Sequence, residues 1–148
     1  MNREQFLEYA DHFNNKRFDK VVGYFCPDVS LEYPDNFMGP QLPGLTGTTL
    51  HGPKEFIANY EALTANIREV LNIGAFLSEG RQFVVELVTE FHVLRTPPPG
   101  APGAQWKEGN VIVMNQMVLY DLDENGKFKR MRIFHHRYLE PKNIKTLS

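Results

Sequence analysis

The chain has 148 residues, of which 42% are hydrophobic and 23% charged, and its net charge at neutral pH is −2. This length and composition predict one soluble globular domain over residues 1–148 and exclude disordered and fibrous classes. Because the chain has no basic excess, we do not expect it to bind nucleic acid or an anionic membrane surface.

Charges interrupt the N-terminal stretch MNREQFLEYADHF, which therefore lacks the apolar segment of a signal peptide. No apolar run reaches the length of a membrane span. Cys26 is the only cysteine, so an internal disulfide is impossible and a reducing compartment is compatible. We therefore expect a cytoplasmic protein.

The first half of the chain has helical periodicity. One apolar stripe runs from Phe6 to Phe13, and a second runs from Phe18 to Phe25 after a short polar break. A third helix is predicted to begin at Gly52-Pro53, since proline suits a first helical turn, and its apolar stripe continues to Ile67.

Strand patterns occupy the rest of the chain. A short strand is predicted over Val29 to Tyr33, followed by a long Gly/Pro-rich loop that ends at Gly52. From Glu69 onward the apolar period becomes two, in the runs VLNIGAFLSEG, RQFVVELVTEFHVL, NVIVMNQMVLYDL and KFKRMRIFHHRYL. Asn125-Gly126 predicts a tight hairpin between the last two runs. Helices followed by an antiparallel meander predict an α+β fold, which forms a cone around a small-molecule pocket if the sheet curls.

Two segments carry a resemblance to known proteins. The stretch YADHFNNKRFDKVVGYFCPDVSLEYP resembles the opening of ketosteroid isomerases and SnoaL-like polyketide cyclases, and NGKFKRMRIFHHRYLEPKNI resembles their closing hairpin. Both groups belong to the nuclear-transport-factor-2-like (NTF2-like) superfamily. The resemblance implies three N-terminal helices packed on a curved antiparallel sheet that encloses a pocket, and it implies a homodimer.

The resemblance also implies roles for residues near the N-terminus. Tyr9 stands where ketosteroid isomerases have a tyrosine that donates a hydrogen bond to the developing oxyanion. Tyr33 stands in place of their carboxylate base, and a phenol with an ordinary pKa of about 10 is a poor base, which argues against familiar steroid isomerisation. Asp35 would supply a carboxylate if its loop folds back, although aspartate in YPDN is also typical of a turn.

The final strand contains the pair His135-His136, and strand alternation sends these two side chains to opposite faces. The resemblance directs one set toward the pocket, namely Met131, Ile133, His135 and Arg137. It leaves the other set on the convex side, namely Arg132, Phe134, His136 and Tyr138. An imidazole transfers protons at neutral pH and an inward arginine can hold an enolate, which makes His135 the leading catalytic candidate. The alternative is a histidine hydrogen-bonded at the edge of the core, with Arg137 reaching solvent.

Further polar residues interrupt the two central strands. Glu90 and His92 share one face of their strand. If this is the outer face of the sheet, both side chains are solvated. If it lines the cone, they form an acid and base set with His135 that resembles the one in scytalone dehydratase. Asn115 and Gln116 interrupt an apolar run, so one of them is expected to point inward, and the register leaves open which.

Two aromatic residues complete the predicted substrate-binding set. Tyr60 lies on the buried stripe of the third helix, and Trp106 lies in TPPPGAPGAQWKEG, which is a plausible rim or lid. We expect no metal, because adjacent histidines cannot chelate jointly from one strand face and no HExxH or cysteine cluster is present. We expect no cofactor, since no nucleotide-binding motif occurs.

These observations predict a cofactor-independent SnoaL-like enzyme that isomerises, cyclises or dehydrates a small apolar carbonyl compound, such as a polyketide or terpenoid intermediate. His135 would move the proton, Tyr9 and Tyr33 would stabilise the oxyanion, and Arg137 or Asn115 would orient the ligand. The alternative is a noncatalytic module that binds a hydrophobic ligand or dimerises. In that case aromatic side chains would fill the cone and leave no cavity of ligand size.

Overall fold

The structure, a computed structural model, describes residues 1–34 and 48–139. Its helices are α1 (Arg3–Asn14), α2 (Phe18–Val21), the 3₁₀ helix η1 (Val22–Tyr24) and α3 (Gly52–Thr64). Its strands are β1 (Phe25–Tyr33), β2 (Thr48–His51), β3 (Ile67–Glu79), β4 (Gln82–Val93), β5 (Val111–Leu122) and β6 (Phe128–Leu139). The helical and strand runs predicted from periodicity are thus present, and the α+β class is confirmed.

The strands form one six-stranded sheet in the order β2-β1-β6-β5-β4-β3. Neighbouring strands are antiparallel except β1 and β6, which pair in parallel. The prediction of a purely antiparallel sheet is therefore wrong at this pair. Hairpins impose antiparallel pairing on consecutive strands, whereas β1 and β6 are separated by most of the chain and have no such constraint.

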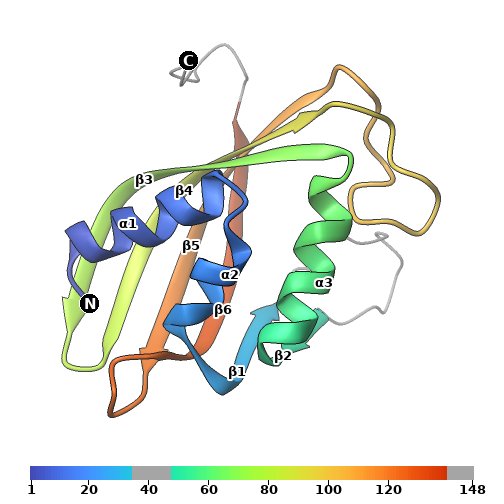
Figure 1. Ribbon diagram of the computed structural model, residues 1–148. Helices are drawn as coiled ribbons and strands as arrows, with labels where there is room; N and C mark the ends of the chain where they lie inside the picture. The colour runs from blue at the N-terminus through green and yellow to red at the C-terminus, as the bar shows by residue number, and fades with distance from the viewer. Residues whose placement is uncertain (35–47, 140–148) are drawn as a thin grey trace.

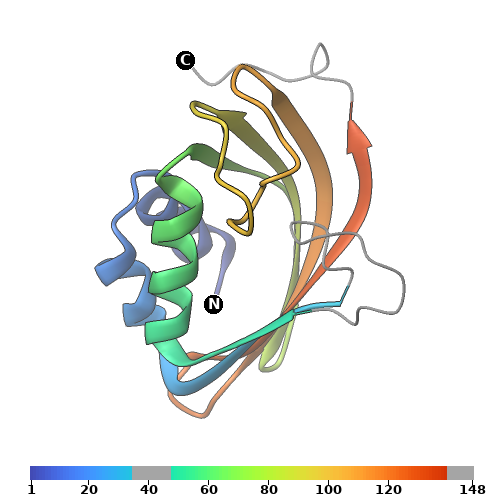
Figure 2. The same cartoon turned by 90° about the vertical axis from the view of Figure 1, so that its right-hand side faces the viewer.

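The helices gather on one side of the sheet, which curls around them (Figures 1 and 2). The concave face of the sheet and the inner faces of the helices bury a largely aromatic core. Its fully buried rings are Phe6, Phe56, Phe91 and Phe128. None of the helices in the described ranges is long and apolar enough to cross a bilayer.

Local signals explain where the helices begin and end. Asn2 caps α1 through a capping box with Gln5, in which each side chain accepts from the other residue's backbone N–H. Gly52 begins α3 with a φ of +74°, a backbone conformation that glycine adopts without strain. The helix ends at Thr64, earlier than predicted, and Ile67 instead begins β3 opposite Val93. The β-branched side chain of Ile67 suits this strand position.

Phe6 is expected to contribute more to stability than any exposed neighbour. Its side chain is fully buried, and its ring lies 5.3 to 6.0 Å from the rings of Tyr9, Phe76, Phe83 and Tyr120. Replacing it with alanine should lower the free energy of unfolding by about 3–5 kcal/mol in urea titrations. The adjacent Leu7 is 41% exposed, so Leu7→Ala is the matched control and should cost less than about 1 kcal/mol. Equal losses for the two variants would contradict this packing.

Candidate functional site

A cavity of about 40 Å³ lies between the helices and the concave face of the sheet. Most of its wall is apolar, and its polar lining residues are Tyr9, Tyr33, Tyr60, Glu69, Gln116 and Tyr120. This volume admits roughly three water molecules, and it is well below the roughly 150 Å³ of a cavity that holds benzene. Met131 and Ile133 also line it, as predicted for the final strand.

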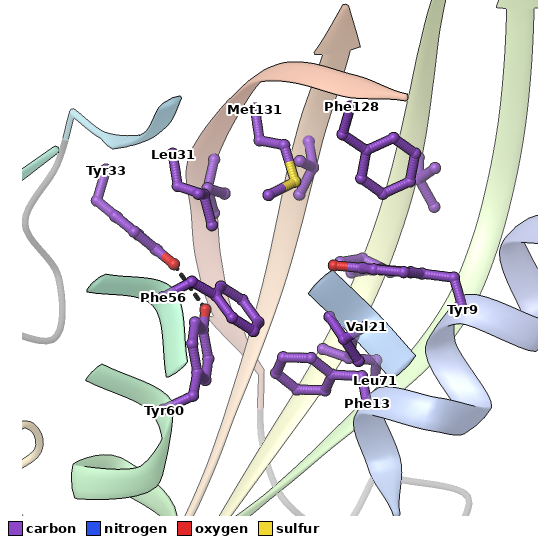
Figure 3. Packing of buried hydrophobic residues seen from close by; sticks show 14 of the residues in the cluster. Tyr9, Phe13, Val21, Leu31, Tyr33, Phe56, Tyr60, Leu71, Phe128 and Met131 are labelled. Carbon is purple, nitrogen blue, oxygen red and sulfur yellow. Dashed lines mark hydrogen bonds between the residues drawn. The ribbon is translucent and has the colours of Figure 1, made fainter. Parts of the chain in front are cut away.

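Three tyrosines from different elements bring their hydroxyls to the interior. Tyr33 on β1 and Tyr60 on α3 are hydrogen-bonded to each other, with 2.6 Å between their oxygens (Figure 3). Tyr9 enters from α1, on the other side of this interior (Figure 3). Burial is the main factor that raises the pKa of all three above the ordinary value of 10, so their hydroxyls stay protonated and can donate hydrogen bonds.

Glu69 and Tyr120 are polar lining residues that the sequence does not predict, and Glu69 is the ionisable carboxyl. It pairs with Phe91 in the β3–β4 ladder, so its side chain shares the concave face with a fully buried ring. The residue is 8% exposed, and its Oε2 atom has no hydrogen-bond partner among the described residues. Burial raises the pKa of the carboxyl to about 8.

A signal for Glu69 was present in the sequence. Ile67, Glu69 and Leu71 occur at alternate positions, and on a strand alternate residues share one face. Since Ile67 and Leu71 are apolar, the glutamate between them had to face the core together with them. The predicted third helix extends to Ile67, and this boundary hides the alternation.

The register settles which of two adjacent amides faces the cavity. Gln116 lines the cavity, whereas Asn115 lies on the opposite face and donates from Nδ2 to Oε1 of Glu86 at 3.0 Å. The predicted ligand contact from Asn115 is therefore not part of this site. Thr89 fixes the Gln116 side chain, because its hydroxyl donates to Oε1 of Gln116 at 2.7 Å.

An extra residue in β6 changes the predicted orientation of its last residues. Gln116 pairs with His135 but Asn115 pairs with Arg137, so His136 is a bulge. The bulge reverses the alternation beyond it, and the inward orientation predicted for Arg137 is wrong. Arg137 and His136 instead lie near Glu86, where their charges help the Asn115 hydrogen bond to lower the pKa of that carboxyl.

His135 keeps its predicted side of the sheet but does not line the cavity. It shares a face with Gln116, and its ring centroid is 4.6 Å from that of Tyr138. Tyr138 pairs with the buried Met114, so the bulge also brings Tyr138 to the concave side rather than to the predicted convex side. Ile133 is the last residue of β6 to reach the cavity.

Glu90 and His92 lie on the convex face, away from the cavity. Oε2 of Glu90 is 2.7 Å from Nε2 of His92, and its Oε1 accepts from Nδ2 of Asn72 at 2.9 Å. The acid and base set that we considered with His135 is therefore not assembled. Glu90 is nevertheless buried, which a simple solvated face would not predict.

The remaining predicted residues lie elsewhere. Trp106 is buried against Phe91, with ring centroids 5.2 Å apart, and does not line the cavity. Asp35 lies outside the described residues. Within residues 1–34 and 48–139, no three histidine, cysteine or acidic side chains are arranged to hold a metal ion.

Comparisons with known proteins identify the family of this chain. A family model described as SnoaL-like domain matches residues 6–131. The chain belongs to this SnoaL-like family. It is thus part of the NTF2-like superfamily, as the two resembling segments predicted. A comparison with curated proteins found no significant match.

Three solved structures share the fold of this chain. A candidate polyketide cyclase from Xanthomonas campestris pv. campestris has 18% identity and a TM-score of 0.68, with 86% of this chain and 84% of that chain covered. The epoxide hydrolase/cyclase-like enzyme SalBIII, from pyran ring formation in salinomycin, has 18% identity and a TM-score of 0.62, with 92% and 95% covered. A computationally designed binder of 17-OHP has 14% identity and a TM-score of 0.61, with 86% and 85% covered. At these identities the likeness establishes the fold alone.

Proposed function

We propose that this SnoaL-like protein catalyses proton transfer next to the carbonyl group of a small apolar substrate, and that Glu69 moves the proton. One observation supports this above all: Oε2 of Glu69 is buried without a partner, and the residue lines a cavity that tyrosine hydroxyls share. Burying an unpaired carboxyl is costly, and such groups concentrate at functional sites. This assignment replaces His135, which does not line the cavity, as the proton carrier.

Enolisation of a ketone uses these groups in a balanced step. The Glu69 carboxylate takes a proton from the carbon next to the carbonyl, and the C–H electron pair forms the C=C bond of an enolate. The negative charge then rests on the carbonyl oxygen, where Tyr9 and the Tyr33–Tyr60 pair can donate hydrogen bonds. The proton returns to the same carbon or to another one, and the second outcome is an isomerisation.

Several features support an apolar carbonyl substrate. The wall around the polar groups consists of residues such as Phe13, Leu31 and Phe56, which favour an uncharged ring. A pKa of about 8 makes Glu69 a stronger base than an ordinary carboxylate while leaving a usable fraction ionised at neutral pH. The polyketide cyclase and cyclase-like names among the relatives support a biosynthetic intermediate as the natural substrate.

A noncatalytic binding module is the second candidate, and the size of the cavity favours it. About 40 Å³ is too small for even a single six-membered ring unless side chains move. The designed binder of 17-OHP illustrates binding without a named reaction. In both candidate functions the protein is a homodimer. Exposure of the apolar side chains Met117 and Phe134 on the convex face supports this assembly.

Deuterium exchange tests the proposal directly. Cyclohexanone and cyclohexane-1,4-dione are small cyclic ketones that fit once side chains of the cavity move, and the loss of their α-proton signals in D₂O can be followed by NMR. We expect protein-catalysed exchange to rise with pH and level off above about pH 8, where Glu69 is ionised.

The two candidate functions give different results in this assay. Binding of either ketone without exchange above the buffer rate between pH 6 and pH 9 would favour the binding module. Exchange that does not depend on pH in this window would remove Glu69 as the base.

A further inference from the structure

The last residue of α1, Asn14, is hydrogen-bonded to the backbone of a strand that comes much later in the chain. Its Nδ2 donates to the carbonyl oxygen of Leu71 at 3.1 Å, and its Oδ1 accepts from the N–H of Leu71 at 2.8 Å. Leu71 lies on β3, which is the last strand at one edge of the sheet. The side-chain amide therefore pairs with this edge as a neighbouring strand would, and it satisfies both backbone polar groups of Leu71.

This link joins the two elements that carry Glu69 and Tyr9. Glu69 comes two residues before Leu71 on β3, about 7 Å away along the strand, and its side chain lies on the same concave face. Tyr9 comes five residues before Asn14 on α1, also about 7 Å away along the helix axis. Glu69 and Tyr9 line the cavity, whereas Asn14 is not part of its wall.

Two hydrogen bonds from one planar amide fix the position of α1 along β3. Elsewhere α1 packs on the core through apolar side chains such as Phe6 and Phe13, and apolar contact is not directional. A slide of α1 along β3 would break both hydrogen bonds and would move the Tyr9 hydroxyl relative to the Glu69 carboxyl. These two groups already interact, because burial is the main factor that raises the pKa of Tyr9 and the charges of Tyr33 and Glu69 add to it.

We propose that Asn14 is a positioning residue, which holds the Tyr9 hydroxyl of α1 at a fixed distance from the Glu69 carboxyl of β3. Asn14 acts through these two residues and does not touch the substrate. Its effect on catalysis rests on the proposed function, whereas the geometry that it maintains exists without turnover. The alternative is an amide that only covers the edge of the sheet and adds to stability.

The neighbouring residue Asn15 supplies a matched control. Its Nδ2 also takes part in two hydrogen bonds, to the backbone oxygen and to Oδ1 of Asp11, and both acceptors belong to α1. Asn15→Ala therefore removes as many side-chain hydrogen bonds as Asn14→Ala does, without loosening α1 from β3.

The kinetics of cyclohexanone α-proton exchange test the positioning role, at a temperature where circular dichroism shows each variant to be folded. We expect Asn14→Ala to lower kcat at least about tenfold and to leave KM within about twofold, because small displacements of catalytic groups lower the rate more than the binding. Asn15→Ala should match wild type. If Asn14→Ala does not fold, Asn14→Asp keeps the shape but places an oxygen against the Leu71 carbonyl, and it should give the same loss.

A double-mutant cycle with Tyr9→Phe separates positioning from stability. This substitution removes the hydroxyl that Asn14 holds in place, so adding Asn14→Ala should lower kcat by less than about twofold more. A further tenfold loss in the double variant would overturn the inference, as would a wild-type kcat in Asn14→Ala alone. A residue that only stabilises the fold would not show this coupling.

NMR of ring-labelled tyrosine tests the same geometry without turnover. The ¹³Cζ signal of Tyr9, identified by its loss in Tyr9→Phe, should shift as Glu69 ionises between about pH 5 and pH 10, and Glu69→Gln should abolish this shift. We expect Asn14→Ala to reduce the shift at least about twofold and Asn15→Ala to retain it, because the interaction between two charged or polar groups weakens with distance.

Two results of the NMR titration would overturn the positioning role even if exchange is observed. One is an undiminished shift in Asn14→Ala, and the other is a wild-type signal of Tyr9 that does not respond to Glu69. A shift that depends on Asn14 in a protein without any exchange would remove the proposed reaction and leave the positioning of Tyr9 against Glu69 intact.

Discussion

Replacing Glu69 with glutamine is expected to lower the rate of protein-catalysed α-proton exchange at least about 100-fold, the usual range for losing a general base. Glutamine keeps the size and polarity of the side chain but cannot accept the proton. The tyrosine hydroxyls that would stabilise the enolate remain, so binding of cyclohexanone should change little. The measurement is the exchange rate of cyclohexanone by NMR at pH 8, together with a binding titration of the same variant.

Two matched variants make this result specific. His135→Ala should retain exchange within about threefold of wild type, because His135 does not line the cavity. Glu61→Gln removes a carboxylate from the exposed side of α3 and should leave the rate unchanged. A loss in His135→Ala as large as that in Glu69→Gln would return the proton-transfer role to His135.

The stability of the protein is expected to fall as the pH rises from 5 to 8, and Glu69 should account for most of the difference from its glutamine variant. The pKa of its carboxyl is about 8 in the folded chain, against an ordinary value of 4.5. Between these values the unfolded chain releases a proton that the folded chain retains. Rising pH therefore favours unfolding, and the effect ends once the folded carboxyl also ionises above about pH 8.

The size of this effect follows from the width of the pH window. Each unit between the two pKa values is worth about 1.4 kcal/mol, so Glu69→Gln should gain on the order of 3 kcal/mol relative to wild type between pH 5 and pH 8. Urea titrations at pH 5, 6, 7 and 8 measure this difference, and groups that titrate alike in both proteins cancel. Glu61→Gln is again the control.

If the free energy of unfolding of Glu69→Gln differs from that of wild type by the same amount at all these pH values, Glu69 titrates as an exposed carboxyl does. This result would also remove the main reason to regard Glu69 as a base adapted to neutral pH. A difference that grows in the opposite direction would mean that the ionised form is the stabilised one, and would require a cationic partner for Glu69.

Glu69 links the stability of the protein to its proposed function. A carboxyl that lowers stability at neutral pH is a cost that a purely structural role does not explain. Glutamine at position 69 should therefore produce a protein that is more stable and less active. Stability gained at the expense of activity is typical of active-site substitutions.

The sequence by itself determined the class of the fold and most of its elements. The helical stripe from Phe6 to Phe13, the Gly52-Pro53 helix start and the Asn125-Gly126 hairpin are local signals, and local signals depend on neighbouring residues alone. The two segments that resemble NTF2-like proteins predicted the superfamily, because they span the opening helices and the closing hairpin. The resemblance also indicated Tyr9 and Tyr33, whereas Tyr60 followed from the apolar stripe of the third helix.

Only the tertiary structure decided which polar residues share the cavity. The extra residue His136 reverses the faces beyond it, and nothing in the local pattern of β6 requires that bulge. The pairing of β5 with β4 and β6 likewise turned Gln116 inward and Asn115 outward, although their sequence contexts are alike. Side-chain direction on a strand depends on register, and register is set by partners distant in the chain. For the same reason, it is the pairing of β3 with β4 that identifies Glu69 as a buried acid on the concave face.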